Sequence, residues 1–137
     1  MNQEFKLIVA GGRDFTDYEK LSRVLFAMAE VELADKAVSI VSGMAKGADA
    51  LGVRFAKENS VTLYECPANW DKYGKSAGFR RNEQMGRESD GLLAFWDGES
   101  KGTKNMIEFM KKLGKPTTVI RYEAEPIPEH MGYYANE

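Results

Sequence analysis

The sequence predicts an α/β fold with a single Rossmann-like, doubly wound parallel sheet of about five strands and an irregular C-terminal tail. Short apolar runs alternate with segments whose apolar residues recur every three or four positions, as strands and helices alternate in a parallel sheet. Glycine clusters follow three of the apolar runs, where strand-to-helix turns are expected. Because crossovers between parallel strands are right-handed, five strands favour the order 3-2-1-4-5.

The first strand and helix follow from a glycine stop and a capping pattern. Residues 5–10 are apolar and end at two glycines, as in a short buried strand. Thr16 and Glu19 have the spacing of a capping box, and apolar residues follow at helical spacing. We therefore expect a helix over residues 17–33.

The middle of the chain repeats this alternation. Residues 37–41 and 61–65 are expected strands, and the apolar face from Ala48 to Phe55 indicates a helix between them. Residues 66–77 contain proline, asparagine and glycine, which is typical of a long loop. Residues 78–88 are expected to form the next helix.

The last elements complete the sheet. Residues 92–96 and 117–122 are the fourth and fifth expected strands. The helical spacing of Thr103, Met106, Ile107 and Met110 indicates the helix between them, which Gly114 and Pro116 stop. We expect one domain over residues 1–122 and a tail over residues 123–137.

Composition limits the class of protein. The chain has 137 residues, a net charge of −2, one cysteine and one histidine. These counts exclude an internal disulfide and a His/Cys zinc site, so no metal site is predicted, although Mg²⁺ can accompany a ligand phosphate. No segment has the length and apolarity of a membrane span, and the N-terminus lacks signal-peptide features. We expect a cytoplasmic protein with no membrane partner.

Three glycine-rich turns form the candidate site. They occupy residues 11–15, 42–49 and 97–103, after the first, second and fourth strands. Backbone N–H groups at such turns, with the N-terminus of the following helix, favour phosphate binding. The expected strand order places the turns after strands 1 and 4 at the switch point, where such sheets bind ligands. The predicted ligand-binding residues are Gly11, Gly12, Arg13, Asp14, Gly43, Lys46, Gly47, Asp49, Trp70, Arg80, Arg81, Asp97, Gly102 and Thr103.

Several of these residues also have simpler structural explanations. Arg13 and Lys46 suit a phosphate but can be solvated surface charges. Asp14 fits a helix cap better than a catalytic group. Asp49 lies in the expected first turn of a helix, where a carboxylate is favoured by the helix dipole alone. Thr103 offers its hydroxyl and N–H at the start of a helix.

The region of residues 70–81 carries three aromatics and two adjacent arginines. Trp70, Tyr73 and Phe79 surround a glycine-containing loop, and we favour a wall or lid that stacks on a base over a small satellite core. Arg80 and Arg81 differ by about 100° in direction on a helix, so only one is expected to face the ligand. The other is expected to pair with Glu83 or Glu88.

With the segments at residues 11–15, 42–49, 67–70, 73–74, 77–85 and 101–103, the chain resembles the YspA-type (YpsA-related) branch of the SLOG superfamily. This superfamily includes DprA-like and LOG-like Rossmann domains. The resemblance implies a modified Rossmann fold that binds a nucleotide or nucleotide-derived ligand, with Asp49 as an acceptor for ribose hydroxyls.

One departure from the LOG-type pattern bears on activity. LOG-type relatives that cleave nucleoside monophosphates carry a glutamate just after a Gly-Thr motif and an arginine on the preceding helix. Arg80 or Arg81 matches the arginine, but Lys104 follows Gly102-Thr103 and the nearest acid on that helix is Glu108. The resemblance therefore does not predict LOG-type hydrolase activity for this chain. The catalytic residues stay unknown, with Asp14, Asp49 and Arg80 as candidates.

Three functions remain open. The first is a nucleotide-binding module that senses or sequesters its ligand. The second is an enzyme that hydrolyses or transfers an N-glycosidic bond of a nucleotide, for which a carboxylate near the sugar is needed. The third is DNA binding as in DprA-like relatives, against which the acidic net charge argues. Relatives often pair through helices, so we also expect a homo-oligomer.

Overall fold

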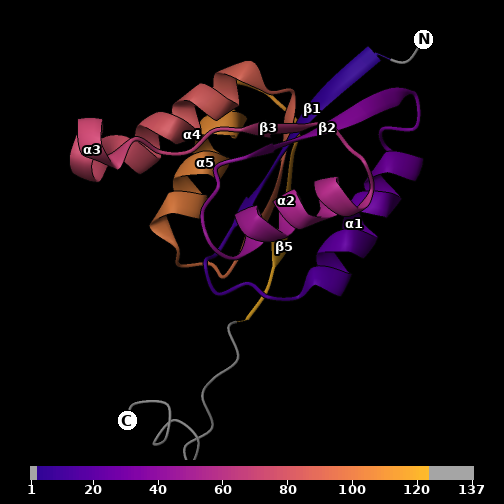
Figure 1. Cartoon of the computed structure of the whole chain (residues 1–137), viewed down its shortest axis with the longest axis horizontal. Helices are drawn as coiled ribbons and strands as arrows, with labels where there is room; N and C mark the ends of the chain where they lie inside the picture. Colours follow the sequence, from indigo (N-terminus) through magenta and orange to yellow (C-terminus); the bar gives the residue numbers. More distant parts are fainter. Residues whose placement is uncertain (1–2, 124–137) are drawn as a thin grey trace, which may run out of the picture.

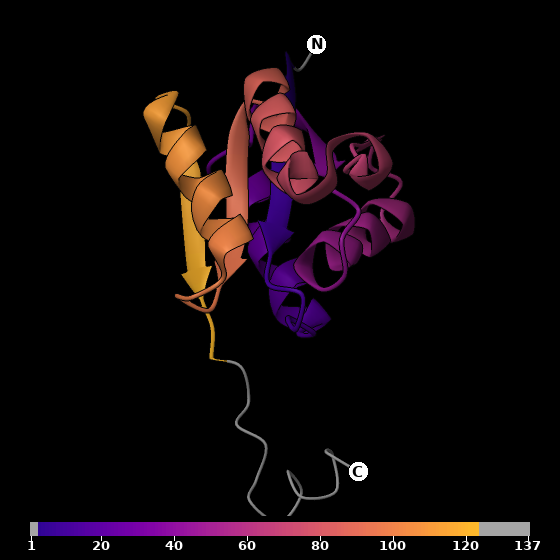
Figure 2. The same ribbon diagram turned by 90° about the vertical axis from the view of Figure 1, so that its left-hand side faces the viewer.

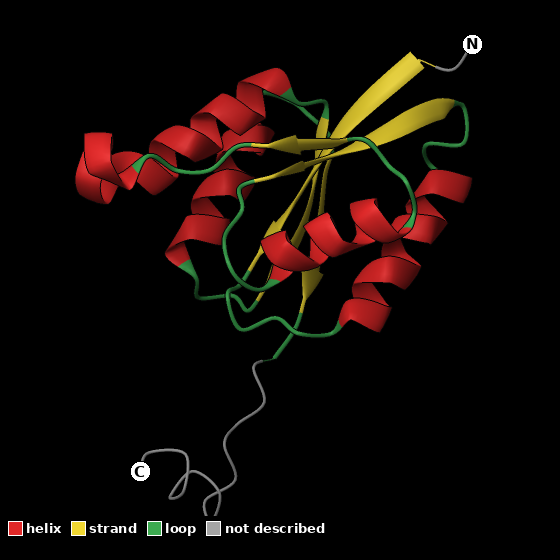
Figure 3. Ribbon diagram, viewed as in Figure 1, coloured by secondary structure: helices red, strands yellow, loops and turns green. Residues whose placement is uncertain are grey.

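Five parallel strands form one sheet in the order β3-β2-β1-β4-β5, as predicted (Figures 1 and 3). The computed structural model describes residues 3–123. The strands are β1 (Gln3–Gly11), β2 (Lys36–Ser42), β3 (Leu63–Glu65), β4 (Gly91–Trp96) and β5 (Thr117–Arg121). The helices are α1 (Tyr18–Glu30), α2 (Ala48–Glu58), α3 (Trp70–Tyr73), α4 (Ala77–Glu88) and α5 (Lys101–Lys112), with a short 3₁₀ turn η1 (Gly74–Ser76) between α3 and α4.

The alternation of side chains along β1 builds two cores. Leu7 and Val9 pack in one core with residues of α1 and α2. Ile8 and Ala10 pack in the other with residues of α4 and α5. The sheet is therefore covered on both faces, and Figure 2 shows α4 and α5 side by side on the second face. Burial on both faces explains why the central strands are apolar runs without alternation.

Three local predictions need correction. The N-cap of α1 is Asp17, whose Oδ1 accepts a hydrogen bond from the Lys20 N–H at 3.0 Å, so the capping box on Thr16 is wrong. Aspartate is as good an N-cap as threonine, and sequence alone does not choose between adjacent caps.

The expected loop over residues 66–77 contains α3 and η1, and the Asn69 side chain caps α3 by accepting from the Lys72 N–H at 3.1 Å. The third strand begins at Leu63, two residues later than expected.

No helix within residues 3–123 combines the length and apolarity needed to cross a membrane. The expected tail, except for Glu123, lies outside the described residues.

Lys115 closes the end of α4. Its Nζ donates to the carbonyl oxygens of Gly86 at 2.6 Å, Ser89 at 2.7 Å and Arg87 at 3.2 Å. A helix C-terminus leaves carbonyls without partners, and a cation there satisfies them and complements the dipole. This contact ties the chain just before β5 to the end of α4.

Lys115→Met is expected to lower the free energy of unfolding by about 1–3 kcal/mol, because three carbonyls lose a charged donor. Chemical denaturation measures the change. Lys112→Met, which removes the same charge from an exposed position in the last turn of α5, is the control and should leave the stability nearly unchanged. Equal stability losses in both variants would contradict the capping role of Lys115.

Candidate functional site

A cleft of about 230 Å³ opens beyond the carboxyl ends of β1 and β4. The chain runs from β1 to β2 and β3 on one side and returns to β4 and β5 on the other, so this is the switch point of the sheet. Four parts of the chain line the cleft: Ala10, Gly11 and Arg13 after β1, Ala45 and Asp49 after β2, Trp70, Lys75, Gly78, Phe79, Arg81, Asn82 and Met85 from α3 to α4, and Ser100, Gly102, Thr103 and Met106 at the start of α5.

The glycine turns after β1 and β2 pack against one another, and Gly11 and Arg13 of the first turn line the cleft. The Gly12 carbonyl accepts from the Phe15 and Ala48 N–H groups, each at 3.2 Å. A Cβ on Gly47 would lie 2.1 Å from that same carbonyl oxygen. A Cβ on Gly11 would lie 2.3 Å from the Phe95 carbonyl oxygen. These glycines are therefore needed to bring the turn after β1 close to the turn after β2 and to the end of β4.

Asp49 is a buried carboxylate beside the cleft. It lies in the first turn of α2 with only 5% of its surface exposed, and its Oδ2 accepts from the Ala45 N–H at 3.3 Å. Burial raises the pKa of Asp49 above its ordinary value, and the Ala45 N–H and the Arg81 charge oppose that rise only in part. A buried acid with a perturbed pKa in a cleft is characteristic of functional sites.

Arg81 reaches the same place from α4. Its Nη1 donates to the Gly43 carbonyl at 2.6 Å, and its Nε donates to Asn82 Oδ1 at 3.1 Å. A Cβ on Gly43 would lie 2.8 Å from Arg81 Nη1 and 2.9 Å from Asp49 Oδ2. The missing side chain at Gly43 thus leaves room for the guanidinium to approach the buried carboxylate.

Asn82 is a site residue that was not predicted from the sequence. It is buried, and its side-chain amide donates to the Gly102 carbonyl at 3.1 Å and to Asn105 Oδ1 at 3.0 Å. Because its Oδ1 holds Arg81, it links the guanidinium to the first turn of α5. Its place on the apolar face of a predicted helix could have identified it, because an amide buried there needs hydrogen-bond partners.

The first turn of α5 faces the cleft with polar groups. Thr103 is buried, and its hydroxyl lies 3.3 Å from the Ser100 hydroxyl. Arg13, Lys75 and Arg81 are the basic lining residues, and Asp49 is the acidic one. A helix N-terminus with an excess of positive charge suits an anionic group.

Sequence comparison places the chain in a family. Residues 5–73 match the YspA, cpYpsA-related SLOG family. The gene 61 protein of Mycobacterium phage D29 is 32% identical over 128 residues, covering 88% of this chain and 98% of that protein. The chain belongs to the YspA, cpYpsA-related SLOG family. The resemblance stated from the motifs is therefore confirmed.

Solved structures agree with this SLOG assignment at the level of the fold. DNA processing protein A (DprA) from Streptococcus pneumoniae superposes with a TM-score of 0.67 at 15% identity, over 95% of this chain and 53% of that chain. DprA from Helicobacter pylori, in a structure that describes its single-stranded DNA binding mode, gives 0.56 at 21% identity, over 88% of this chain and 67% of that chain. The SLOG chain thus spans about half the length of the Streptococcus DprA, and the likeness shows the fold.

Of the predicted ligand-binding residues of this SLOG chain, the structure brings Gly11, Arg13, Asp49, Trp70, Arg81, Gly102 and Thr103 together around the cleft. Gly12, Gly43 and Gly47 do not line the cleft, but Gly47 packs against Arg13, and Gly43 packs against Arg81 and Asp49. Lys46 is exposed on the turn before α2 and does not line the cleft.

Two predicted acids have structural partners outside the cleft. Asp14 accepts a hydrogen bond from the Tyr122 hydroxyl through its Oδ1, so its interpretation as the cap of α1 is wrong. Burial and this carboxylate raise the pKa of the Tyr122 phenol. Asp97 accepts from the Glu99 and Ser100 N–H groups, each at 2.8 Å, and these bonds lower the pKa of its carboxyl group. Both acids therefore shape the turns that border the site.

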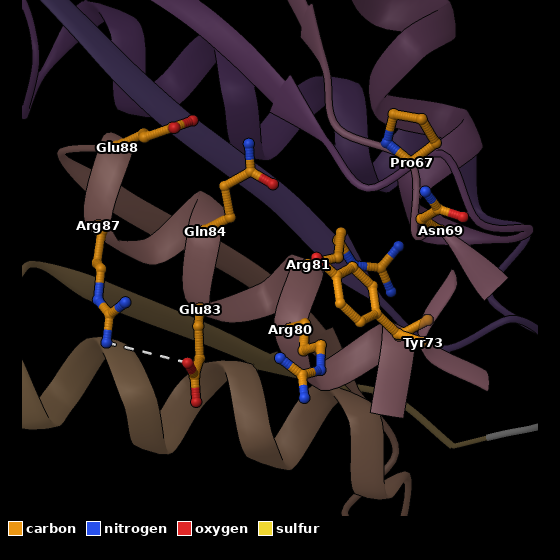
Figure 4. A pocket seen from close by; sticks show the side chains of 10 residues that line it. Pro67, Asn69, Tyr73, Arg80, Arg81, Glu83, Gln84, Arg87 and Glu88 are labelled. Carbon is orange, nitrogen blue, oxygen red and sulfur yellow. Dashed lines mark ion pairs between the residues drawn. The ribbon is translucent and has the colours of Figure 1, made fainter. Parts of the chain in front are cut away.

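Arg80 lies in a second hollow on the other face of α4, the outer groove (Figure 4). This groove of about 430 Å³ is lined by Pro67, Asn69, Tyr73, Ala77, Arg80, Arg81, Glu83, Gln84, Arg87 and Glu88. The Arg80 guanidinium lies 4.5 Å from the Tyr73 ring centroid, and its Nε donates to Ser76 Oγ at 3.0 Å. The expected pairing of the second arginine with Glu83 or Glu88 is wrong, because Arg80 forms no ion pair within residues 3–123 and Glu83 pairs with Arg87 at 3.9 Å.

No metal-binding cluster of three or more histidine, cysteine or acidic residues exists within residues 3–123. Cys66 is half-buried, and burial raises the pKa of its thiol.

Proposed function

We propose that this SLOG domain binds a nucleotide or nucleotide-derived ligand, as a sensing or sequestering module. The ligand occupies the cleft of about 230 Å³ beyond the carboxyl ends of β1 and β4, the inner cleft. The observation that supports this most strongly is the meeting of the buried Asp49, the Arg81 guanidinium and the α5 N-terminus at one switch-point cleft. The phosphate is assigned to Arg13 and to the first turn of α5 around Thr103. The ribose hydroxyls are assigned to Asp49, a carboxylate that accepts hydrogen bonds.

The nature of the ligand is tested first on the protein as purified. Native mass spectrometry followed by gentle denaturation should release a bound nucleotide or nucleotide derivative and identify it. A protein that carries no ligand and binds none in a titration with nucleotides would contradict the proposal. In this proposal Mg²⁺ binds only together with the phosphate of the ligand.

Arg13→Ala and Thr103→Ala are expected to weaken nucleotide binding by roughly tenfold to hundredfold each, because each removes a hydrogen-bonding group from a charged phosphate. Isothermal titration calorimetry measures the change. Lys57→Ala, which removes an exposed charge from the far end of α2, is the control and should bind as the wild type does. Unchanged affinity in both site variants would show that the phosphate lies elsewhere.

A second candidate is cleavage of the N-glycosidic bond of a nucleotide, which the perturbed Asp49 favours. In this reaction water attacks the anomeric carbon, the bond to the base breaks, and the base leaves with a proton. A buried carboxyl group with a raised pKa can accept the proton that the attacking water loses, or supply the proton that the base takes. Release of free base and ribose 5-phosphate from a nucleoside monophosphate, lost in Asp49→Asn, would establish this activity over simple binding.

Single-stranded DNA is a third candidate because of the fold shared with DprA. Net charge argues against it, but exposed aromatics and basic residues near α3 favour it. Affinity for a single strand that falls steeply with salt would identify DNA as the ligand. Whether the chain acts as a homo-oligomer is tested by sedimentation.

A further inference from the structure

Two large aromatic side chains are exposed at the mouth of the inner cleft. Trp70 begins α3 and is 52% exposed, and Phe79 lies in the first turn of α4 and is 47% exposed. Both line the cleft, and neither contacts another aromatic ring among residues 3–123. They do not form the satellite core that was the structural alternative. Exposed apolar surface beside a cleft is a usual mark of a ligand site.

The segment that carries Trp70 has little internal packing. No residue of α3 or η1 is buried, and Figure 1 shows α3 projecting beyond α4 at the edge of the molecule. The indole lies over Gly78, with its Cη2 3.5 Å from the place where a Cβ on that glycine would stand. The segment that carries Trp70 is therefore held in place mainly by its contact with α4.

Tyr73 belongs to a different surface. The Arg80 guanidinium and the Lys72 ammonium lie 4.5 Å and 5.1 Å from its ring centroid, and the ring lines the outer groove (Figure 4). The three aromatics that were expected to form one wall thus form two surfaces. Only Trp70 and Phe79 face the site assigned to the ligand.

We propose that Trp70 and Phe79 bind the base of a single nucleotide whose ribose and phosphate occupy the inner cleft. This inference rests on the proposed function. The cleft of about 230 Å³ is smaller than the roughly 300 Å³ at which sites that enclose a drug-sized ligand begin. It has room for one ribose phosphate, and the base then lies at the mouth between the two rings. The simplest ligand of this class is a nucleoside monophosphate.

Base stacking predicts a specific pattern of affinities. Trp70→Ala should weaken AMP binding by roughly tenfold to hundredfold, the usual cost of losing one stacked ring, and leave ribose 5-phosphate binding unchanged. Tyr73→Ala, three residues further along α3 but on the outer groove, is the matched control and should bind both compounds as the wild type does. Titrations with GMP, CMP and UMP extend the test to the other bases.

Fluorescence provides an independent measurement. The chain has two tryptophans, and Trp70→Phe keeps an aromatic ring while leaving Trp96 as the only indole. AMP should quench the wild-type emission, ribose 5-phosphate should not, and Trp70→Phe should retain the affinity and lose the quenching.

The outcomes separate the two proposals. If Trp70→Ala weakens AMP and ribose 5-phosphate equally, or if the wild type binds no nucleotide more tightly than ribose 5-phosphate, the base does not bind Trp70. The assignment of the aromatic wall is then overturned, and the phosphate site stands. If the wild type binds neither ribose 5-phosphate nor any of the four nucleotides, the proposed function itself fails, and this inference fails with it.

Discussion

Replacing Gly47 by alanine is expected to lower the free energy of unfolding by roughly 3 kcal/mol and the Tm by about 10 °C. Gly47 has φ 78° and ψ −129°, a conformation that residues with a Cβ rarely adopt. The added Cβ would also lie 2.1 Å from the Gly12 carbonyl oxygen and 2.7 Å from Arg13 Cα. Both contacts are with backbone atoms, so the turn after β1 must move. Differential scanning calorimetry and chemical denaturation measure the loss.

Two other glycines separate the causes of this effect. Gly74 has nearly the same conformation, φ 55° and ψ −131°, but a Cβ there meets nothing within 4 Å, so Gly74→Ala reports the strain alone. Gly102 is helical with equally open surroundings, and Gly102→Ala should stabilise α5 by about 0.5–1 kcal/mol. The expected order of stability is Gly102→Ala, wild type, Gly74→Ala, Gly47→Ala. If Gly47→Ala and Gly74→Ala lost the same stability, the close packing of the turns after β1 and β2 would not contribute to the stability of the fold.

The same packing explains why the fold could be predicted from the sequence. The runs at residues 7–10 and 92–96 are apolar at every position because α1 and α2 cover one face of β1 and β4 while α4 and α5 cover the other. Such runs indicate parallel strands buried on both faces, and the glycines that follow mark where the chain turns. Strand order then followed from the handedness of crossovers, and the location of the cleft followed from strand order.

The side chains of the site were less predictable, because their partners come from distant parts of the chain. Sequence offered Arg80 and Arg81 as equivalent neighbours, and the choice of Arg81 depends on the carbonyl of Gly43, which is 38 positions away. Asn82 could not be recognised without its partner at Gly102. The burial of Asp49 depends on how tightly α2 packs on the sheet, and sequence shows only its place in the first turn.

Asp49→Asn is expected to make the protein more stable at neutral pH while weakening its ligand. Burial raises the pKa of Asp49 in the folded protein, whereas the unfolded chain has the ordinary value of about 3.9. Between these two values the folded state binds more protons than the unfolded state, so the wild-type stability falls as the pH rises through the folded pKa. Asparagine resembles the protonated acid and escapes this loss. The stability advantage of the variant should therefore be small near pH 4 and grow towards pH 7.

The nucleotide affinity of Asp49→Asn should fall while its stability rises. This combination distinguishes a residue that binds the ligand from one that only stabilises the fold. A carboxylate that accepts ribose hydroxyls should give a loss of roughly tenfold to hundredfold in nucleotide affinity when it becomes an amide. Asp35→Asn, the same change at an exposed position, should alter neither the pH profile nor the affinity. Denaturation at several pH values and calorimetric titration measure the two quantities. An Asp49→Asn variant that is less stable than the wild type at every pH would mean that the carboxylate stabilises the fold. A stabilised variant with unchanged affinity would remove Asp49 from the ribose site. The paired result, greater stability with weaker binding, is what a charge kept in a buried site for its ligand must produce.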